Sequence, residues 1–160
     1  MLNAAVTPAV RALEAAGVPF TVHEYRHDPA ARGYGLEAAT ALGLDPDQVF
    51  KTLLVTADSG EHAVAIVPVS CQLSLKAVGG ALGRKRVEMC DPAVAQRVTG
   101  YVLGGISPFG QRKPLPTVID ETCELYPLVY VSGGRRGLDL GVAPADLIRL
   151  LGATAADITT

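Results

Sequence analysis

Glycine and proline divide this 160-residue chain into short regular segments, and this division constrains the fold more than any other feature of the sequence. Five mainly apolar stretches end at a glycine, the residue that most readily adopts the left-handed conformation after a helix. Four of the five begin at a capping side chain or at a proline in the first turn. The sequence therefore predicts short helices within residues 7–17, 36–42, 74–82, 91–100 and 144–151.

Strands are expected between these helices. Alternating or β-branched runs predict strands at 20–25, 52–57, 62–69, 86–89, 117–120, 128–132 and 138–142, with Leu103 as a further candidate. Asp58-Ser59-Gly60 predicts a hairpin, and the turn-forming residues of 26–35 predict a loop. Without a linker or a repeat, this pattern favours one mixed α/β domain over residues 1–160. We expect a curved, largely antiparallel or mixed sheet that is barrel-like and flanked by helices.

Composition excludes several classes of protein. Apolar residues make up 49% of the chain and charged residues 19%, a balance that argues against disorder. No apolar run approaches the roughly 18 to 20 residues of a membrane span. Residues 1–5 lack the basic and apolar segments of a secretory signal. Together these features predict a soluble, cytoplasmic protein.

Cysteine and histidine are scarce, so neither a disulfide scaffold nor a metal centre is expected. Cys71, Cys90 and Cys123 have no metal-ligand spacing and are interpreted as reduced packing residues. His23 and His62 fall in predicted strands, where a structural role is favoured. The sequence contains no Walker loop, dinucleotide fingerprint, zinc-protease motif or nucleophile elbow. We predict no metal and no cofactor.

The net charge argues against binding to nucleic acid, whereas the distribution of the basic residues is compatible with it. The net charge of −2 is not typical of a nucleic-acid-binding domain. Half of the fourteen basic residues nevertheless fall in three clusters, Arg84-Lys85-Arg86, Arg112-Lys113 and Arg135-Arg136. Either these clusters share one face that follows a phosphate backbone, or they are unrelated solvated turns. The spacing alone leaves both interpretations open.

Two glycine-rich segments and one lysine are the candidates for chemistry. Gly104-Gly105 precedes Ser107-Pro108, and consecutive N–H groups in such a turn can hold an anion or a developing oxyanion. A plain tight turn has the same composition. Lys51 precedes an apolar strand, from which it can extend to solvent or contact a phosphate. The turn at Gly133-Gly134 leads to Asp139 at the start of another strand.

In combination and in this order, these segments resemble a known family. The motifs are Asp47-Gln48-Val49-Phe50-Lys51-Thr52-Leu53-Leu54, Thr99-Gly100-Tyr101, Gly104-Gly105-Ile106-Ser107-Pro108, Leu115-Pro116-Thr117-Val118-Ile119-Asp120 and Val131-Ser132-Gly133-Gly134 with Gly137-Leu138-Asp139. The chain resembles the YbaK-type Cys-tRNA(Pro) deacylases, which are related to the editing domain inserted in bacterial prolyl-tRNA synthetases. The resemblance extends almost from end to end and implies the fold of that family.

The resemblance implies hydrolysis of the ester that joins a wrong amino acid to the terminal adenosine of a tRNA. By the family pattern, Lys51 would grip the phosphate or ribose end of the acceptor. The loop from Gly104 to Pro108 would shape the amino-acid pocket and provide backbone donors. The residues that this pattern predicts to be catalytic are Lys51, Gly104, Gly105, Ile106, Ser107 and Pro108.

The same resemblance predicts contacts to the substrate. The predicted substrate-binding residues are Tyr25, Tyr34, Asp139, Ser132 and Gly133. An aromatic ring can stack on the terminal adenine, and Asp139 can accept from the α-ammonium group of the substrate. The family carries phenylalanine at the position of Tyr34, so a role for its hydroxyl would be particular to this chain. The alternative interpretation is that the tyrosines are core aromatics and Asp139 caps a turn.

The resemblance also implies a mechanism and partners. The thiol of the substrate cysteine would attack its own carbonyl and leave as a cyclic thioester, so no protein nucleophile is needed. The tRNA would be recognised weakly, with prolyl-tRNA synthetase as a possible partner on the same tRNA. The candidates for phosphate contact are Arg84, Lys85, Arg86, Arg135 and Arg136.

Two further interpretations remain open. The same fold can edit alanine or another amino acid, because a pocket lined by Gly104, Gly105 and Ile106 does not strongly exclude a side chain of similar size. Alternatively, the chain is a non-catalytic module that binds a synthetase or an acceptor stem. The first interpretation predicts hydrolysis of Ala-tRNA(Pro), and the second predicts binding without hydrolysis.

Overall fold

A computed structural model describes residues 6–31 and 33–160. The prediction that no secretory signal is present concerns residues 1–5, which lie outside the described residues. The described strands are β1 (Thr21–Glu24), β2 (Phe50–Ala57), β3 (His62–Pro68), β4 (Val87–Met89), β5 (Thr117–Asp120), β6 (Val129–Arg135), β7 (Leu138–Val142) and β8 (Thr154–Ala156). The described helices are α1 (Pro8–Ala15), α2 (Tyr34–Leu42), α3 (Leu75–Leu82), α4 (Pro92–Thr99), α5 (Pro144–Leu151) and the 3-10 helix η2 (Glu121–Leu125).

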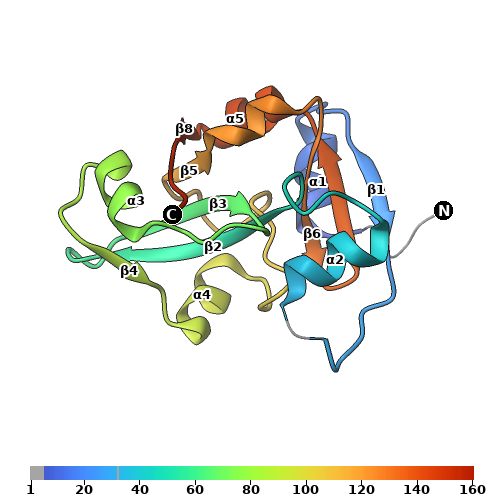
Figure 1. Cartoon of the computed structure of the whole chain (residues 1–160), viewed down its shortest axis with the longest axis horizontal. Helices are drawn as coiled ribbons and strands as arrows, with labels where there is room; N and C mark the ends of the chain where they lie inside the picture. Colours follow the sequence, from blue (N-terminus) through green and yellow to red (C-terminus); the bar gives the residue numbers. More distant parts are fainter. Residues whose placement is uncertain (1–5, 32) are drawn as a thin grey trace.

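The described strands form two sheets that lie side by side along the long axis of the molecule (Figure 1). The smaller sheet has the strand order β1-β7-β6 and is antiparallel throughout. The larger has the order β4-β2-β3-β5-β8, antiparallel on one side of β3 and parallel on the other. A bridge between Val49 and Tyr130 links the two sheets. The mixed α/β class is therefore confirmed, but the sheets do not close into the barrel that the sequence suggested.

The helix boundaries follow the capping residues expected from the sequence. The hydroxyl groups of Thr7 and Ser74 accept hydrogen bonds from the first turns of α1 and α3, and the Asp91 carboxylate does so for α4. The glycines after α2, α3, α4 and α5 adopt the left-handed conformation, with φ between 59° and 82°. All five predicted helices are confirmed.

The sequence prediction needs three corrections. Helix α2 begins at Tyr34, inside the predicted loop, because Gly33 at φ 76° allows the chain to enter the helix without a side-chain cap. Leu103 lies in a turn and not in a strand. Gly133 and Gly134 belong to β6, whose pairing with β7 shifts register between Ser132 and Arg135, so the turn falls later.

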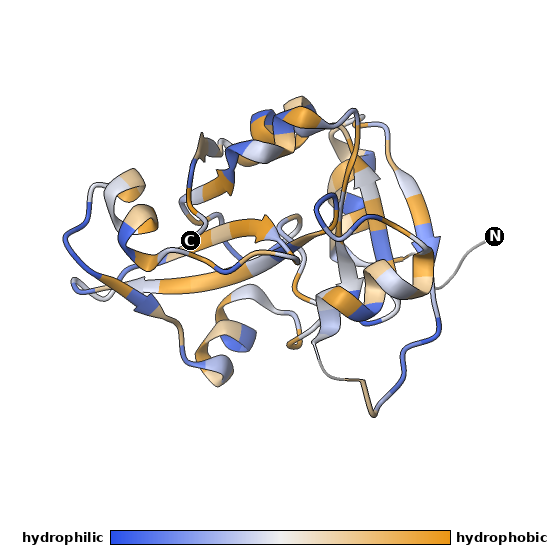
Figure 2. Ribbon diagram, viewed as in Figure 1, coloured by the Kyte–Doolittle hydropathy of each residue, from blue (hydrophilic) through white to orange (hydrophobic). Residues whose placement is uncertain are grey.

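The hairpin of β2 and β3 divides the interior into two apolar clusters. Phe50, Leu54 and Ile66 face the cluster that α1, α5 and the smaller sheet complete. Val55 and Val67 face the cluster that α3 and β4 cover. Both faces of the hairpin are apolar, as Figure 2 shows along β2 and β3. Within the described residues, no helix is both long enough and apolar enough to cross a lipid bilayer.

Candidate active site

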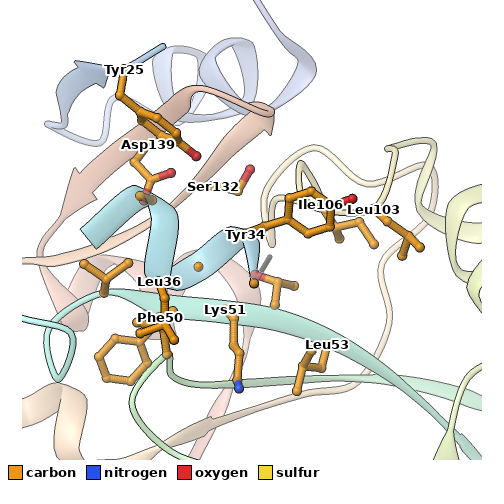
Figure 3. Close-up of a pocket in the computed structure, with 17 residues that line it drawn as sticks. Tyr25, Tyr34, Leu36, Phe50, Lys51, Leu53, Leu103, Ile106, Ser132 and Asp139 are labelled. Carbon is orange, nitrogen blue, oxygen red and sulfur yellow. The ribbon is translucent and has the colours of Figure 1, made fainter. Parts of the chain in front are cut away.

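A pocket of about 330 Å³ lies where α2, the start of β2, the loop after α4 and the strands β6 and β7 meet (Figure 3). Most of its wall is apolar, and a few polar side chains from different elements face it, which is the usual composition of a small-molecule site. The side chains that line it most prominently are Tyr25, Tyr34, Leu36, Phe50, Lys51, Thr52, Leu53, Leu103, Ile106, Ser132 and Asp139.

Lys51 brings a positive charge to this pocket. It is the second residue of β2, and its neighbours Phe50 and Thr52 also line the pocket. Its ammonium group forms no ion pair with any residue that the structure describes. A half-buried cation without a carboxylate partner can contact an anionic group of a ligand.

Asp139 brings a carboxyl group to the other end of the pocket, beside Tyr25 (Figure 3). It lies in β7 with only 5% of its surface exposed. Burial raises the pKa of its carboxyl from 3.8 to about 7. Burial, followed by the negative charge of Asp139, also raises the pKa of the Tyr25 hydroxyl. Within the described part of the chain, the Asp139 carboxyl accepts no hydrogen bond, so its pairing capacity is available to a ligand.

Close packing explains the two glycines of the loop after α4. A Cβ atom on Gly104 would lie 2.5 Å from Cγ of Tyr34, and one on Gly105 would lie 2.8 Å from Cα of Arg135. The N–H of Gly105 donates to the carbonyl of Val102 at 2.9 Å. The N–H groups of Gly104 and Ile106, by contrast, have no hydrogen-bond partner among the described residues. These two residues line the pocket, and their N–H groups keep unused donor capacity there.

The rest of the predicted loop lies outside the lining of this pocket. Ser107 is fully buried, and its Oγ accepts a hydrogen bond from the N–H of Phe109 at 3.3 Å. Pro108 lines a separate cavity of about 200 Å³ between α1 and α5. Neither residue lines the pocket that contains Lys51, and Gly105 does not line it either. The loop predicted to be catalytic therefore reaches this pocket through Gly104 and Ile106.

Of the predicted substrate-binding residues, all except Gly133 line the pocket. Tyr34 lies at the pocket with 38% of its surface exposed, and Ser132 lines the pocket from β6. Gly133 does not line the pocket. Its carbonyl accepts a hydrogen bond from the Thr7 hydroxyl, and a Cβ atom there would collide with Leu138. Gly133 therefore packs the strand behind Ser132.

The basic clusters lie at different ends of the molecule. Arg136 contacts the pocket wall, with its guanidinium carbon 4.7 Å from the centre of the Tyr34 ring. Its neighbour Arg135 pairs with Glu24 at 2.8 Å. Arg84, Lys85 and Arg86 are exposed between α3 and β4, at the far end of the long axis in Figure 1. The structure does not bring these two clusters together.

Thr52 is a pocket residue that sequence reasoning missed. Its Oγ1 is buried and has no hydrogen-bond partner within the described residues. A buried hydroxyl group without a hydrogen-bond partner lowers the stability of the folded protein unless a ligand supplies the missing hydrogen bond. No separate signal in the sequence points to Thr52, because threonine is common in strands. No group of three or more histidine, cysteine, aspartate or glutamate side chains among residues 6–31 and 33–160 is placed to hold a metal ion.

A small apolar pocket that offers a cation, a carboxyl group and unpaired backbone donors defines a site for a small zwitterionic or ester-containing group. The family model described as "Aminoacyl-tRNA editing domain" matches residues 28–150, which includes every residue that lines the pocket except Tyr25. The chain therefore belongs to the aminoacyl-tRNA editing domain family. As a member of this family, it is an aminoacyl-tRNA hydrolase that deacylates mischarged tRNA.

Individual relatives agree with this assignment. An Enterococcus faecalis protein named "Putative Cys-tRNA(Pro)/Cys-tRNA(Cys) deacylase EbsC" is 33% identical over 154 residues, which cover 96% of this chain and 93% of that protein. A proline–tRNA ligase of Citrifermentans bemidjiense is 34% identical over 88 residues, 55% of this chain and 15% of the ligase. A crystal structure of "a putative trans-editing enzyme for prolyl tRNA synthetase" has a TM-score of 0.85 at 28% identity, and the match covers 100% of this chain and 99% of that one. The predicted family and fold are thus confirmed.

Proposed function

We propose that residues 1–160 form one trans-acting editing domain that removes cysteine from Cys-tRNA(Pro). The observation that carries this proposal is the pocket itself, which combines Lys51, Asp139 and the N–H groups of Gly104 and Ile106. The name of the Enterococcus faecalis relative supports cysteine as the amino acid and proline tRNA as one carrier. The similarity to part of a proline–tRNA ligase supports prolyl-tRNA synthetase as a partner. Because the substrate is charged tRNA, we expect activity in the cytoplasm.

Each polar group of the pocket has a role in this proposal. Lys51 would contact the phosphate or ribose of the terminal adenosine, and Asp139 would accept from the α-ammonium group of the amino acid. The N–H groups of Gly104 and Ile106 would stabilise the negative charge that develops on the carbonyl oxygen. The rings of Tyr25 and Tyr34 would pack on the adenosine or the amino acid. Ser132 adds a hydroxyl group on the same side as Asp139.

The nucleophile in this proposal is the substrate. The thiolate of the bound cysteine attacks its own carbonyl carbon, the bond to the ribose oxygen breaks, and the ribose hydroxyl leaves with a proton. The product is a cyclic thioester that water then opens to free cysteine. Cys71, Cys90 and Cys123 do not line the pocket, and burial raises the pKa of the Cys123 thiol to about 11. A nucleophilic role for the cysteines of the chain is therefore disfavoured.

The test is release of cysteine from Cys-tRNA(Pro) by the wild type, Lys51→Ala and Lys76→Ala. Lys76 is an exposed lysine of α3 and serves as the matched control. We expect the Lys51 variant to be at least about a hundredfold slower, because its charge acts at the reacting end of the substrate. The Lys76 variant should match the wild type. Equal rates for all three proteins would remove Lys51 from the site.

The apolar wall of the pocket also favours a second candidate substrate, Ala-tRNA(Pro). The pocket volume of about 330 Å³ and the side chains of Leu53, Leu103 and Ile106 would accept alanine as readily as cysteine. Turnover of Cys-, Ala- and Ser-tRNA(Pro) by the wild type separates the two substrates. Faster release of alanine would keep the editing reaction and reject the thiol mechanism. Binding of all three tRNAs without any release would favour a non-catalytic module.

A further inference from the structure

The guanidinium group of Arg136 contacts two segments that line the pocket. Arg136 lies in the turn between β6 and β7, and its carbon Cζ is 4.7 Å from the centre of the Tyr34 ring at the start of α2. Its Nε donates to the carbonyl of Leu103 in the loop after α4, at 2.8 Å. Tyr34 and Leu103 line the pocket, and Arg136 contacts both of them from just outside its lining.

The Tyr34 ring contacts the same loop directly. A Cβ atom on Gly104 would lie between 2.5 and 2.8 Å from Cγ, Cδ1 and Cδ2 of the ring, so the ring packs on the backbone of Gly104. Figure 3 shows the ring directed toward Leu103 and Ile106. Tyr34 is the first residue of α2 and follows Gly33, which caps the helix without a side-chain hydrogen bond. The ring therefore stands at the N-terminal end of α2, in contact with the loop after α4.

We propose that Arg136 is a positioning residue, which holds the Tyr34 ring against Gly104 and thereby fixes the N–H groups of Gly104 and Ile106 at the reacting carbonyl. The proposal rests on the proposed function of the pocket. A guanidinium suits this task because its carbon lies over the ring while its Nε donates to the Leu103 carbonyl. Lysine has the same charge but cannot combine these two contacts in one plane.

This role differs from a phosphate contact, which is the other use of an arginine beside a tRNA-binding pocket. A phosphate contact needs the charge, whereas the positioning role needs the shape of the guanidinium. Arg136→Lys separates them because it keeps the charge and removes the planar group. Arg149→Lys is the matched control, since Arg149 is an exposed arginine of α5 that pairs with Asp146.

The first measurement is steady-state deacylation of Cys-tRNA(Pro) by the wild type and both variants. We expect Arg136→Lys to lower kcat by about tenfold to a hundredfold, because the donors move relative to the carbonyl. Its KM for tRNA should stay within about a factor of two of wild type. Arg149→Lys should behave as the wild type. A normal kcat with a raised KM for Arg136→Lys would identify a phosphate contact and overturn the positioning role.

The second measurement does not depend on activity. Amide hydrogen exchange of the free proteins should be faster at Glu37, Leu103 and Gly105, whose N–H groups are hydrogen-bonded, in Arg136→Lys than in Arg149→Lys. Unchanged exchange at these residues would contradict the positioning role even if tRNA is deacylated. Faster exchange in a protein whose wild type deacylates no charged tRNA would keep the packing role and reject the proposed function. The two failures are therefore distinguishable.

Coupling to Tyr34 gives a last check. In a Tyr34→Leu background, Arg136→Lys should cost less than a third of its effect on kcat in the wild type, because the ring that it holds is gone. Equal effects in both backgrounds would show that Arg136 acts independently of Tyr34 and would reject the proposal.

Discussion

Two aspartates are buried in this protein, and they differ in what surrounds them. Asp120 at the end of β5 is 1% exposed and accepts hydrogen bonds from Ile158 and from both the N–H and the hydroxyl of Thr122. Asp139 in β7 is 5% exposed and accepts none from the residues described here. The carboxylate of Asp120 is hydrogen-bonded within the protein, whereas the carboxyl group of Asp139 can still accept hydrogen bonds from a ligand. The difference predicts that the carboxylate of Asp120 contributes to stability and that the carboxyl group of Asp139, which lines the pocket, contributes to ligand binding.

Replacing Asp120 should have the largest effect. Asp120→Ala would leave the N–H of Ile158 and the N–H of Thr122 without their acceptor in a buried region. Because hydrogen bonds to charged groups are strong, we expect a loss of about 3 to 5 kcal/mol in the free energy of unfolding. Urea denaturation measures it. A loss below about 1 kcal/mol would mean that the two aspartates do not differ in this way.

Replacing Asp139 should change stability in the opposite direction. Its pKa is about 7 in the folded protein against 3.8 for the free group, so the folded protein binds the extra proton between these values. The contribution of this carboxyl group to the free energy of unfolding is therefore greatest below pH 3.8. It is lost progressively as the pH rises from 3.8 to the folded-state pKa of about 7. Between pH 5 and pH 8 the wild type should lose about 2 to 3 kcal/mol that Asp139→Asn retains.

Urea denaturation of both proteins at pH 5 and pH 8 is the measurement. Asp139→Asn should be the more stable protein at pH 8 and should release cysteine from Cys-tRNA(Pro) at least about tenfold more slowly. A variant that is less stable than the wild type at pH 8 would show that Asp139 has a structural partner. A variant with normal activity would remove Asp139 from the substrate contacts.

Two threonines of β2 extend the same comparison on a smaller scale. The Thr52 hydroxyl at the pocket has no partner among the described residues, whereas the Thr56 hydroxyl lies 3.1 Å from Nδ1 of His62. Thr52→Val should therefore stabilise the protein by about 1 kcal/mol, and Thr56→Val should destabilise it by a similar amount. Thermal denaturation of the two variants gives the signs. A destabilised Thr52→Val would mean that its hydroxyl is already satisfied.

The sequence predicted local structure well because its signals are local. Thr7, Ser74 and Asp91 cap the predicted helices, and glycines end them. The helix and the strand at residues 144–151 and 117–120 were predicted with their observed bounds. Strand order was not predicted, because it depends on contacts between segments distant in the sequence. The 3-10 helix η2 and the strand β8 were missed, since each is too short to carry a periodic pattern.

The site was predicted only in part, because local motifs identify single residues but not the contacts between distant segments. Lys51 and Asp139 are single residues within motifs, and both line the pocket. The pair Gly104-Gly105 was left open as an anion-binding turn or a plain tight turn, and the structure adds that both glycines pack closely, against Tyr34 and Arg135. The contacts of Arg136 could not be anticipated, because they join three segments that only the tertiary structure brings together. Sequence therefore identified the residues of the pocket better than the contacts that arrange them.

The smallest effects are expected at the basic cluster far from the pocket. Lys51 is the second residue of β2 and Ala57 is the last, so they lie roughly 20 Å apart at the rise of a β-strand. Arg84 and Arg86 lie beyond the Ala57 end, where Arg84 pairs with Glu61 on the surface. Replacing both with glutamine should change the free energy of unfolding by less than about 0.5 kcal/mol, because exposed ion pairs contribute little.

The cluster should also matter less for tRNA than the arginines beside the pocket. Arg135→Gln should lower the slope of log KM against log salt by about 1, as expected for one lost phosphate contact. The Arg84→Gln, Arg86→Gln double variant should lower it by less, although it removes twice the charge. A larger change in the double variant would mean that the tRNA runs along β2 to the far end of the molecule. The surface that binds the acceptor would then extend well beyond the pocket, and the two basic clusters would form one interface despite their separation.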